Sequence, residues 1–235
     1  MSYTGDVRVG GGSDLRVLDH VEIRKLAVGP MENNAYLLTC RHDGAQLLVD
    51  AADEAEGLVE LVREGSGAGR LDVVVTTHRH PDHTRALRSL VAVTGATVAV
   101  GAADADAVEA STDVPVGTRL RHGDVVTFGH VTLDVIELRG HTPGSIALAY
   151  TEPAHATGPE AVPGRVHLFT GDSLFPGGVG ATRGNADHFA QLIDDVTSRV
   201  FAVFDDRTWV YPGHGLDTTL GAERPSLDEW RARGW

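Results

Sequence analysis

Residues 73–87 read "VVVTTHRHPDHTRAL" and place three histidines and an aspartate within six positions, directly after a run of valine and threonine. The nearly continuous apolar run "LDVVVTT" predicts a strand that is covered on both faces. The next segment, "PDHTRALRSLVAVTG", begins with a proline, a favoured first residue of a helix, and ends on a glycine. The histidine cluster therefore lies at a predicted strand-to-helix junction.

The spacing of the donor side chains in this cluster predicts a metal site. Alternate residues of an extended segment point the same way, so His78 and His80 can reach one ion. The turn into the helix directs Asp82 and His83 toward a second ion. The alternative is a polar cap at the start of the helix, in which Asp82 only favours the helix dipole.

Strands and helices alternate along the rest of the chain. Two halves, each with strands followed by a helix, predict two sheets packed back to back with helices outside. No change of composition marks a boundary, so we expect one domain over residues 1–235, with a candidate flexible N-terminus at 1–14 and a short tail at 216–235. Strands are predicted at 34–40, 45–51, 71–77, within 123–138, and at 146–151, 166–171 and 208–213, and helices at 54–65, 81–95 and 186–204.

The composition excludes several classes of function. With 33 Asp and Glu against 20 Lys and Arg, the net charge of −13 argues against nucleic acid and anionic membranes as partners. No stretch approaches about 18 uninterrupted apolar residues. The single cysteine, Cys40, cannot form an internal disulfide, and the first residues lack a signal segment, so we expect a cytoplasmic protein. Cys40 lies in the apolar run "NAYLLTC", which predicts a buried and inert thiol.

Three later segments offer matching donors, each in a turn rich in glycine or proline that follows a strand. They contain His141 in "RGHTPGS", Asp172 in "FTGDSLF" and His214 in "YPGHG". Imidazole and carboxylate are ligands of zinc, iron and manganese. Taken singly, each of the three could instead be a turn residue. The remaining histidines are interpreted as ordinary polar surface residues: His20, His42, His122, His130, His155, His167 and His188.

The segments "THRHPDH", "GHTPGS", "GDSLF" and "YPGHG", in this order, resemble the metallo-β-lactamase superfamily, and within it the glyoxalase II-like (hydroxyacylglutathione hydrolase-like) hydrolases. The resemblance covers about residues 20–216. It implies an α+β fold, a four-layer αββα sandwich with the metals at one edge of the two sheets. By resemblance, His78, His80 and His141 bind the first metal, Asp82, His83 and His214 bind the second, Asp172 bridges both, and Asp50 steadies the histidine loop, unless Asp50 only ends its strand.

The resemblance also implies a mechanism. Two divalent ions, zinc before iron or manganese, share a water, lower its pKa from about 15.7 to about 7 and hold the resulting hydroxide against a carbonyl carbon. Asp172 bridges the ions and Asp82 orients the nucleophile. A thiolate leaves readily, so we expect the substrate to be a small molecule, a thioester of a small thiol. The sequence gives no prediction of the oligomeric state.

Two departures from the family pattern limit which thiol carriers the chain is expected to recognise. Many relatives carry an arginine soon after the "GDSLF" motif, whereas Ala181 stands there in this chain and Arg183 follows two residues later. The 20 residues after "YPGHG" are too few for the helical domain that completes the glutathione site. Arg183 is therefore a candidate to bind a carboxylate of another thiol carrier, or else a solvated loop residue.

Three alternatives remain open to the sequence. The first is an enzyme like persulfide dioxygenase, with a single iron held by His78, His141 and Asp172, and the absent arginine argues against it. The second is a lactone hydrolase with the same two metals. The third is a non-catalytic metal-binding module, and the presence of all seven donors argues against that alternative.

Overall fold

Two β-sheets form the centre of the protein in a computed structural model that describes residues 2–234. The larger sheet is antiparallel from β1 to β4 and parallel from β4 to β7, and the smaller sheet is antiparallel except where β11 and β14 run parallel. The larger sheet has the order β1 (Asp14–Val17), β2 (Val21–Val28), β3 (Asn33–Cys40), β4 (Gln46–Val49), β5 (Val73–Thr76), β6 (Thr97–Gly101) and β7 (Thr118–Leu120). The smaller sheet has the order β15 (Thr218–Thr219), β14 (Trp209–Pro212), β11 (Val166–Gly171), β10 (Ile146–Thr151), β9 (Val131–Glu137) and β8 (Val125–Phe128), and β12 (Leu174–Phe175) pairs with β13 (Gly178–Val179).

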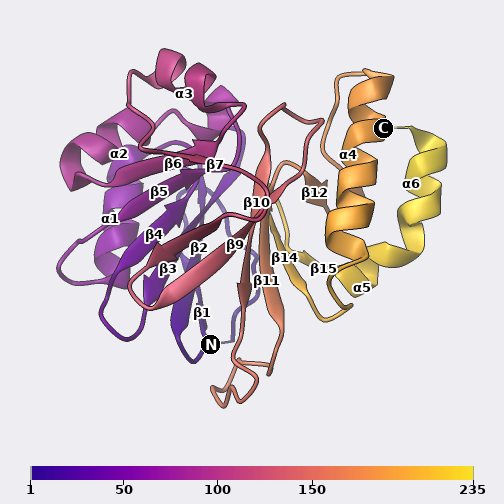
Figure 1. Cartoon of the computed structure of the whole chain (residues 1–235). Helices are drawn as coiled ribbons and strands as arrows, with labels where there is room; N and C mark the ends of the chain where they lie inside the picture. The colour runs from indigo at the N-terminus through magenta and orange to yellow at the C-terminus, as the bar shows by residue number, and fades with distance from the viewer. Residues whose placement is uncertain (1, 235) are drawn as a thin grey trace.

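Helices cover the outer face of each sheet, so the αββα sandwich predicted from the resemblance is confirmed (Figure 1). On the larger sheet lie α1 (Ala55–Gly65), α2 (Leu87–Thr94) and α3 (Ala105–Thr112). The smaller sheet carries α4 (Ala186–Val196) and α6 (Leu227–Arg233), and α5 (Leu220–Glu223) joins β15 to the last helix. Among the described residues, no helix is both long and apolar enough to cross a bilayer.

The side-chain alternation of the strands builds three apolar layers. In β4, Leu47 and Val49 point into the core between the sheets, whereas Leu48 packs under the helices of the larger sheet. On the other sheet, Phe169 faces the central core and its neighbour Leu168 packs under α4. Each sheet is thus buried on both faces, and this packing fixes the positions of the loops at the ends of its strands.

Several segments differ from the sequence prediction. The helix predicted over 81–95 begins later, with α2 at Leu87. Pro81–His83 form one turn of 3-10 helix, and the residues after them bind the loop that follows β4. There the N–H groups of Arg85 and Ala86 donate to the carbonyls of Ala52 and Ala51. Strands β2 and β6 and helix α3 were not predicted. In β2 the buried Lys25 interrupts the apolar pattern.

Segments near both ends of the described chain pack against the sandwich. Tyr3 is 7% exposed, and its hydroxyl donates to Asp217 at 2.7 Å. In the predicted tail, Trp230 of α6 is 1% exposed and meets the ring of Phe201 edge to face. The segment predicted as the helix 186–204 consists of α4 and a π-helical turn at Thr197–Phe201.

Candidate metal centre

One end of the sandwich gathers every predicted metal ligand. The strands β4, β5, β11 and β14 end there, and β3 and β10 begin there. Their loops bring seven donor side chains into three overlapping groups, in each of which one donor atom per residue lies within 4.8 Å of the others. The groups are His78, His80 and His141; His78, His83 and Asp172; and Asp82, His83 and His214.

The first group consists of three imidazoles that face one another. His80 Nδ1 lies 2.9 Å from His141 Nε2, which lies 3.3 Å from His78 Nε2. The last group contains a carboxylate, because Asp82 Oδ2 lies 3.3 Å from His214 Nε2 and 3.5 Å from His83 Nε2. Six nitrogen and oxygen atoms thus converge in two adjacent subsites.

Asp172 lies between the two subsites. Its Oδ1 is 3.3 Å from His83 Nε2, and its Oδ2 is 3.5 Å from His214 Nε2 and 3.6 Å from His141 Nε2. One carboxylate therefore contacts imidazoles of both subsites. Its Oδ2 alone contacts one ring of each subsite, so this carboxylate could be shared between them.

Hydrogen bonds on the outer side of the imidazoles orient the rings. His141 Nδ1 donates to the carbonyl of Ala181 at 2.8 Å, and His214 Nδ1 donates to that of Met31 at 2.9 Å. A carbonyl only accepts, so the proton sits on Nδ1 and the Nε2 lone pair faces the centre. Such outer partners fix the tautomer that a metal needs.

Asp50 lies directly behind the second subsite. Its carboxylate is 2.8 Å from His83 Nδ1 and accepts hydrogen bonds from the backbone N–H and the hydroxyl of Thr77 at 2.7 and 2.8 Å. Thr77 precedes His78 in the chain, so one buried carboxylate holds a ring of one subsite and the backbone of the other. Asp50 is therefore in a position to steady the histidine loop, and that role stays a prediction.

Burial and charge set the protonation of the cluster. Burial lowers the pKa values of His78, His80 and His141, which keeps these imidazoles neutral. Burial also disfavours a charge on His83, but the carboxylates of Asp50 and Asp172 outweigh it and raise its pKa to about 10. The second subsite therefore attracts positive charge, which a proton supplies when no other cation does.

The donor set fits a bound cation by a further criterion. His83 Nε2 and Asp172 Oδ1 are buried atoms that lie 3.3 Å apart and yet make no hydrogen bond of acceptable geometry. Leaving buried polar atoms unpaired is costly, and native proteins pair the great majority of them. A cation coordinated by both atoms would remove this cost.

Two residues of the centre were missed by the sequence analysis. Asn33 is fully buried, and its Nδ2 donates to Asp82 Oδ2 at 3.0 Å, which fixes that carboxylate. Gly213 leaves no room for a side chain, because a Cβ atom there would collide with Asp172 and His83. The only sequence signals are a polar residue at the start of a buried strand and the glycine in "YPGHG".

Arg183 lies at the exposed mouth of the centre. Its Nη2 is 3.5 Å from His80 Nε2, and its backbone adopts φ 53°, a left-handed conformation that is uncommon outside glycine. The loop that carries it also presents Ala181, whose carbonyl orients His141. The guanidinium is therefore beside the first subsite.

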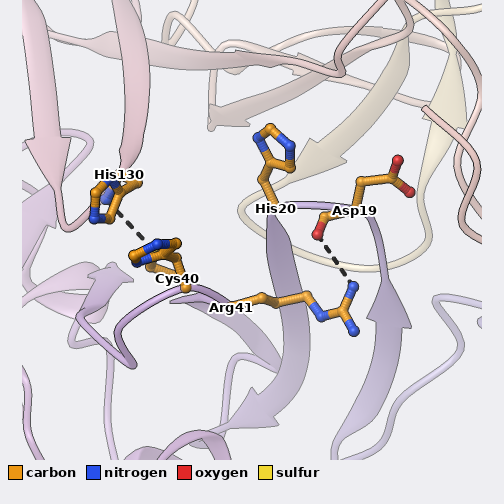
Figure 2. A pocket seen from close by; sticks show the side chains of 6 residues that line it. Asp19, His20, Cys40, Arg41 and His130 are labelled. Atoms are coloured by element: carbon orange, nitrogen blue, oxygen red, sulfur yellow. Dashed lines mark hydrogen bonds between the residues drawn. The ribbon is translucent and has the colours of Figure 1, made fainter. Parts of the chain in front are cut away.

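A separate pocket of about 580 Å³ lies at the opposite end of the sandwich (Figure 2). The strand β3 joins the two ends, since Asn33 bridges to His214 and Cys40 lines the pocket. Seven steps along a strand span roughly 23 Å. The pocket is therefore remote from the metal centre and contains none of its donors. It is lined by Asp19, His20, Cys40, Arg41, His42 and His130.

Comparison with known proteins places this geometry in a family. The sequence model of the metallo-beta-lactamase superfamily matches residues 28–214, a range that contains all seven donors. The chain belongs to the metallo-beta-lactamase superfamily. Within this superfamily, the chain is 37% identical over 149 residues to a hydroxyacylglutathione hydrolase of Fuscovulum blasticum. That match covers 63% of this chain and 51% of the relative, so the chain spans about half of the relative's length.

Two solved structures are similar to this chain in sequence as well as in fold. ETHE1 from Myxococcus xanthus superposes with a TM-score of 0.68 at 26% identity, over 89% of this chain and 84% of that one. TTHA1623, solved in a di-iron-bound form, superposes with a TM-score of 0.64 at 28% identity, over 85% of this chain and 96% of that one.

Proposed function

We propose that this protein is a metal-dependent hydrolase that cleaves a thioester, an S-acyl derivative of a small thiol. The observation that carries the proposal is the convergence of seven imidazole and carboxylate donors in three overlapping groups. Similarity to a hydroxyacylglutathione hydrolase supports the thioester as the bond that is cleaved. The similarity to TTHA1623, solved with two irons, supports two ions.

We propose that His78, His80 and His141 hold the first ion, that Asp82, His83 and His214 hold the second, and that Asp172 bridges them. Zinc is the first candidate for both ions, with iron or manganese as alternatives, because the ligands are nitrogen and oxygen atoms without a thiolate. When bound, divalent ions supply Lewis acidity and lower the pKa of a coordinated water to about 7.

The chain's own residues orient the reactants. Asp82 is fixed by Asn33 and can accept a hydrogen bond from the attacking water, which aims the oxygen lone pair at the carbonyl carbon. The hydrogen bonds of His141 and His214 to backbone carbonyls hold each ring in one tautomer. A thiolate leaves without needing a proton, so the reaction requires no separate general acid.

Arg183 is the residue that we propose to recognise the thiol carrier. Its guanidinium lies beside His80 at the exposed mouth, where it can pair with a carboxylate of the substrate. Ala181 contributes a backbone carbonyl to the centre rather than a charged side chain. These features support a small anionic thioester as the substrate. We also propose a cytoplasmic location, with which a single buried and unpaired cysteine is compatible.

A second candidate is the oxidation of a persulfide at a single iron, because the chain is 26% identical to ETHE1 from Myxococcus xanthus. Such an enzyme would need His78, His141 and Asp172 but not Asp82. The fixed position of Asp82 between Asn33 and His214 favours the two-metal hydrolase. Lactone hydrolysis and metal binding without catalysis are weaker candidates, since neither has a specific observation in its favour.

The test is metal analysis of the purified chain together with assays on thioesters, lactones and persulfides, the last with an oxygen electrode. We expect up to two ions per chain, thioester hydrolysis that chelators abolish, and no oxygen uptake. Asp172→Asn serves as the inactive control. Oxygen uptake with a persulfide and no thioester turnover would reverse the ranking of the two candidates, and absence of metal after reconstitution would reject both.

A further inference from the structure

Asp104 is a buried carboxylate that the proposed chemistry does not use. It is fully buried and occupies the position just before α3, where an aspartate ordinarily accepts a hydrogen bond from the first turn of its helix. The side chain of Asp104 makes no such bond. Its carboxylate turns instead toward the loops of the metal centre.

Both carboxylate oxygens of Asp104 bind these loops. Oδ2 accepts hydrogen bonds from the backbone N–H of Arg79 at 3.1 Å and from the hydroxyl of Thr142 at 2.5 Å. Oδ1 accepts one from the backbone N–H of Gly144 at 3.1 Å, and the half-exposed Arg79 guanidinium lies 3.7 Å from it. One carboxylate therefore joins two loops that are about 60 residues apart in the chain.

The bonded residues are the immediate neighbours of the three imidazoles of the first subsite. Arg79 stands between His78 and His80, and Thr142 follows His141. Asp104 thus binds the backbone of both loops that carry the three rings. The outer contacts of the His78 and His80 rings are few: the Thr77 hydroxyl lies 3.1 Å from His78 Nδ1, and neither ring donates to a carboxylate or a backbone carbonyl, so the backbone contributes strongly to their position.

The "GHTPGS" segment is closed around the same carboxylate. The Ser145 hydroxyl lies 2.6 Å from that of Thr142 and accepts from the Thr142 N–H at 3.1 Å. A Cβ atom at Gly144 would collide with the backbone and the side chain of Asp104. Thr142 and Gly144 therefore pack directly on the Asp104 carboxylate, and Ser145 holds Thr142 in place.

We propose that Asp104 is a positioning residue of the first metal subsite: it sets the separation between the His78–His80 loop and His141, and thereby the affinity of that subsite, without touching the ion. The second subsite does not depend on it, because Asp50, Asn33 and the Met31 carbonyl orient His83, Asp82 and His214. The inference rests on the proposed two-ion site.

The test is a titration of the apo full-length chain with zinc in competition with a chromophoric chelator, for the wild type and for Asp104→Asn. Both are also titrated in the Asp82→Asn background, where we expect only the first subsite to fill. We expect Asp104→Asn to weaken the first subsite by roughly 10 to 100-fold, as for other residues that orient ligands, and to leave the second unchanged. The matched control is Asp106→Asn, an exposed aspartate of the same helix.

Thr142→Val provides an independent variant that keeps side-chain shape and removes one donor to Asp104. We expect it to weaken the same subsite, and we expect the double variant with Asp104→Asn to be less than additive. Wild-type zinc affinity in Asp104→Asn, or equal weakening of both subsites, would overturn the inference. A wild-type chain that binds no zinc would instead reject the proposed function itself.

Discussion

The metal centre and a second buried polar cluster lie along the same strand of the smaller sheet. The second cluster, here the Glu152 cluster, consists of Arg16, Glu152, Arg165, His167 and Tyr211. Strand β11 carries His167 near its start and leads to Asp172 just after its end. Both clusters bury imidazole and carboxylate groups, and they differ in how these groups are paired.

The Glu152 cluster is internally satisfied. His167 Nδ1 lies 2.8 Å from the Tyr211 hydroxyl and its Nε2 lies 2.8 Å from Glu152. Arg165 donates to the same carboxylate at 3.1 Å, and Arg16 donates to Tyr211 at 2.7 Å. In the metal centre, His83 Nε2 and Asp172 Oδ1 make no hydrogen bond. A buried histidine by itself therefore does not indicate a metal site. Nitrogen and oxygen atoms that face one another without a hydrogen bond do indicate one.

The largest expected effect concerns Asp82 in the metal centre. Asp82→Asn keeps the shape of the side chain and removes the charge that holds the second ion. We expect one ion per chain to be lost and thioester turnover to fall by roughly 1,000-fold, since an ion contributes several kcal/mol to the transition state.

Metal stoichiometry and rate, measured on the same sample, check this expectation. The control is Asp134→Asn, an exposed residue of β9. Unchanged stoichiometry with near-normal turnover would remove the two-metal hydrolase from first place, because a single-iron enzyme has no need of Asp82.

The next effect tests the Glu152 cluster as a structural element. Glu152→Gln removes the charge between the buried His167 and Arg165, so we expect the free energy of unfolding to fall by about 3 kcal/mol. Metal stoichiometry of the folded protein should not change. Urea denaturation measures the loss, with the exposed Glu60→Gln as its control. Loss of bound metal without loss of stability would show that the two clusters are not separate.

A smaller effect follows from the pH dependence of stability. Burial lowers the pKa of His167 from 6.5 to about 4, although Glu152 acts against it. The unfolded chain therefore binds the extra proton first, and stability is lost as pH falls from 6.5 toward 4. At pH 5 this loss is about 2 kcal/mol.

His167→Gln removes this titration, so its free energy of unfolding should fall less than that of the wild type between pH 7 and pH 5. Both proteins are measured by denaturant titration as metal-free chains, which keeps the contribution of the metal centre equal. Identical pH profiles would mean that folding does not lower the pKa of His167.

The smallest effect is expected at Cys40, which belongs to neither cluster. The thiol is 1% exposed, as predicted, and its Sγ accepts from the N–H of His130 at 3.4 Å. Cys40→Ser should keep most of the turnover and change the free energy of unfolding by about 1 kcal/mol. If alkylation of the folded protein abolished turnover, the remote pocket would be coupled to the metal centre.

The sequence alone predicted the layered fold and the seven donors of the centre, because each donor follows a buried strand in a turn rich in glycine or proline. The three central runs of β3, β4 and β5 are apolar enough to indicate their burial. The structure brings all seven predicted donors together, and their role as ligands stays a prediction. The domain limits and the role of Arg183 likewise stay predictions.

The prediction that His167 is an ordinary surface residue is wrong, since it is fully buried. The short apolar context of "VHLFTG" is compatible with either face, and only the pairing of β11 with β10 sets which side chains point inward. The partners that make its burial tolerable, Glu152 and Tyr211, lie 15 and 44 residues away in the sequence.

Tertiary structure alone decided the residues that act on the centre through others. Asn33 reaches Asp82 across 49 residues, and Asp104 joins the loops at Arg79 and Thr142 from the start of a helix that the sequence did not predict. Ligand positions follow from local geometry, since a turn after a strand directs its donor to the sheet edge. Their supporting hydrogen bonds depend on which loops meet there, and that is fixed only when two sheets and their helices have packed.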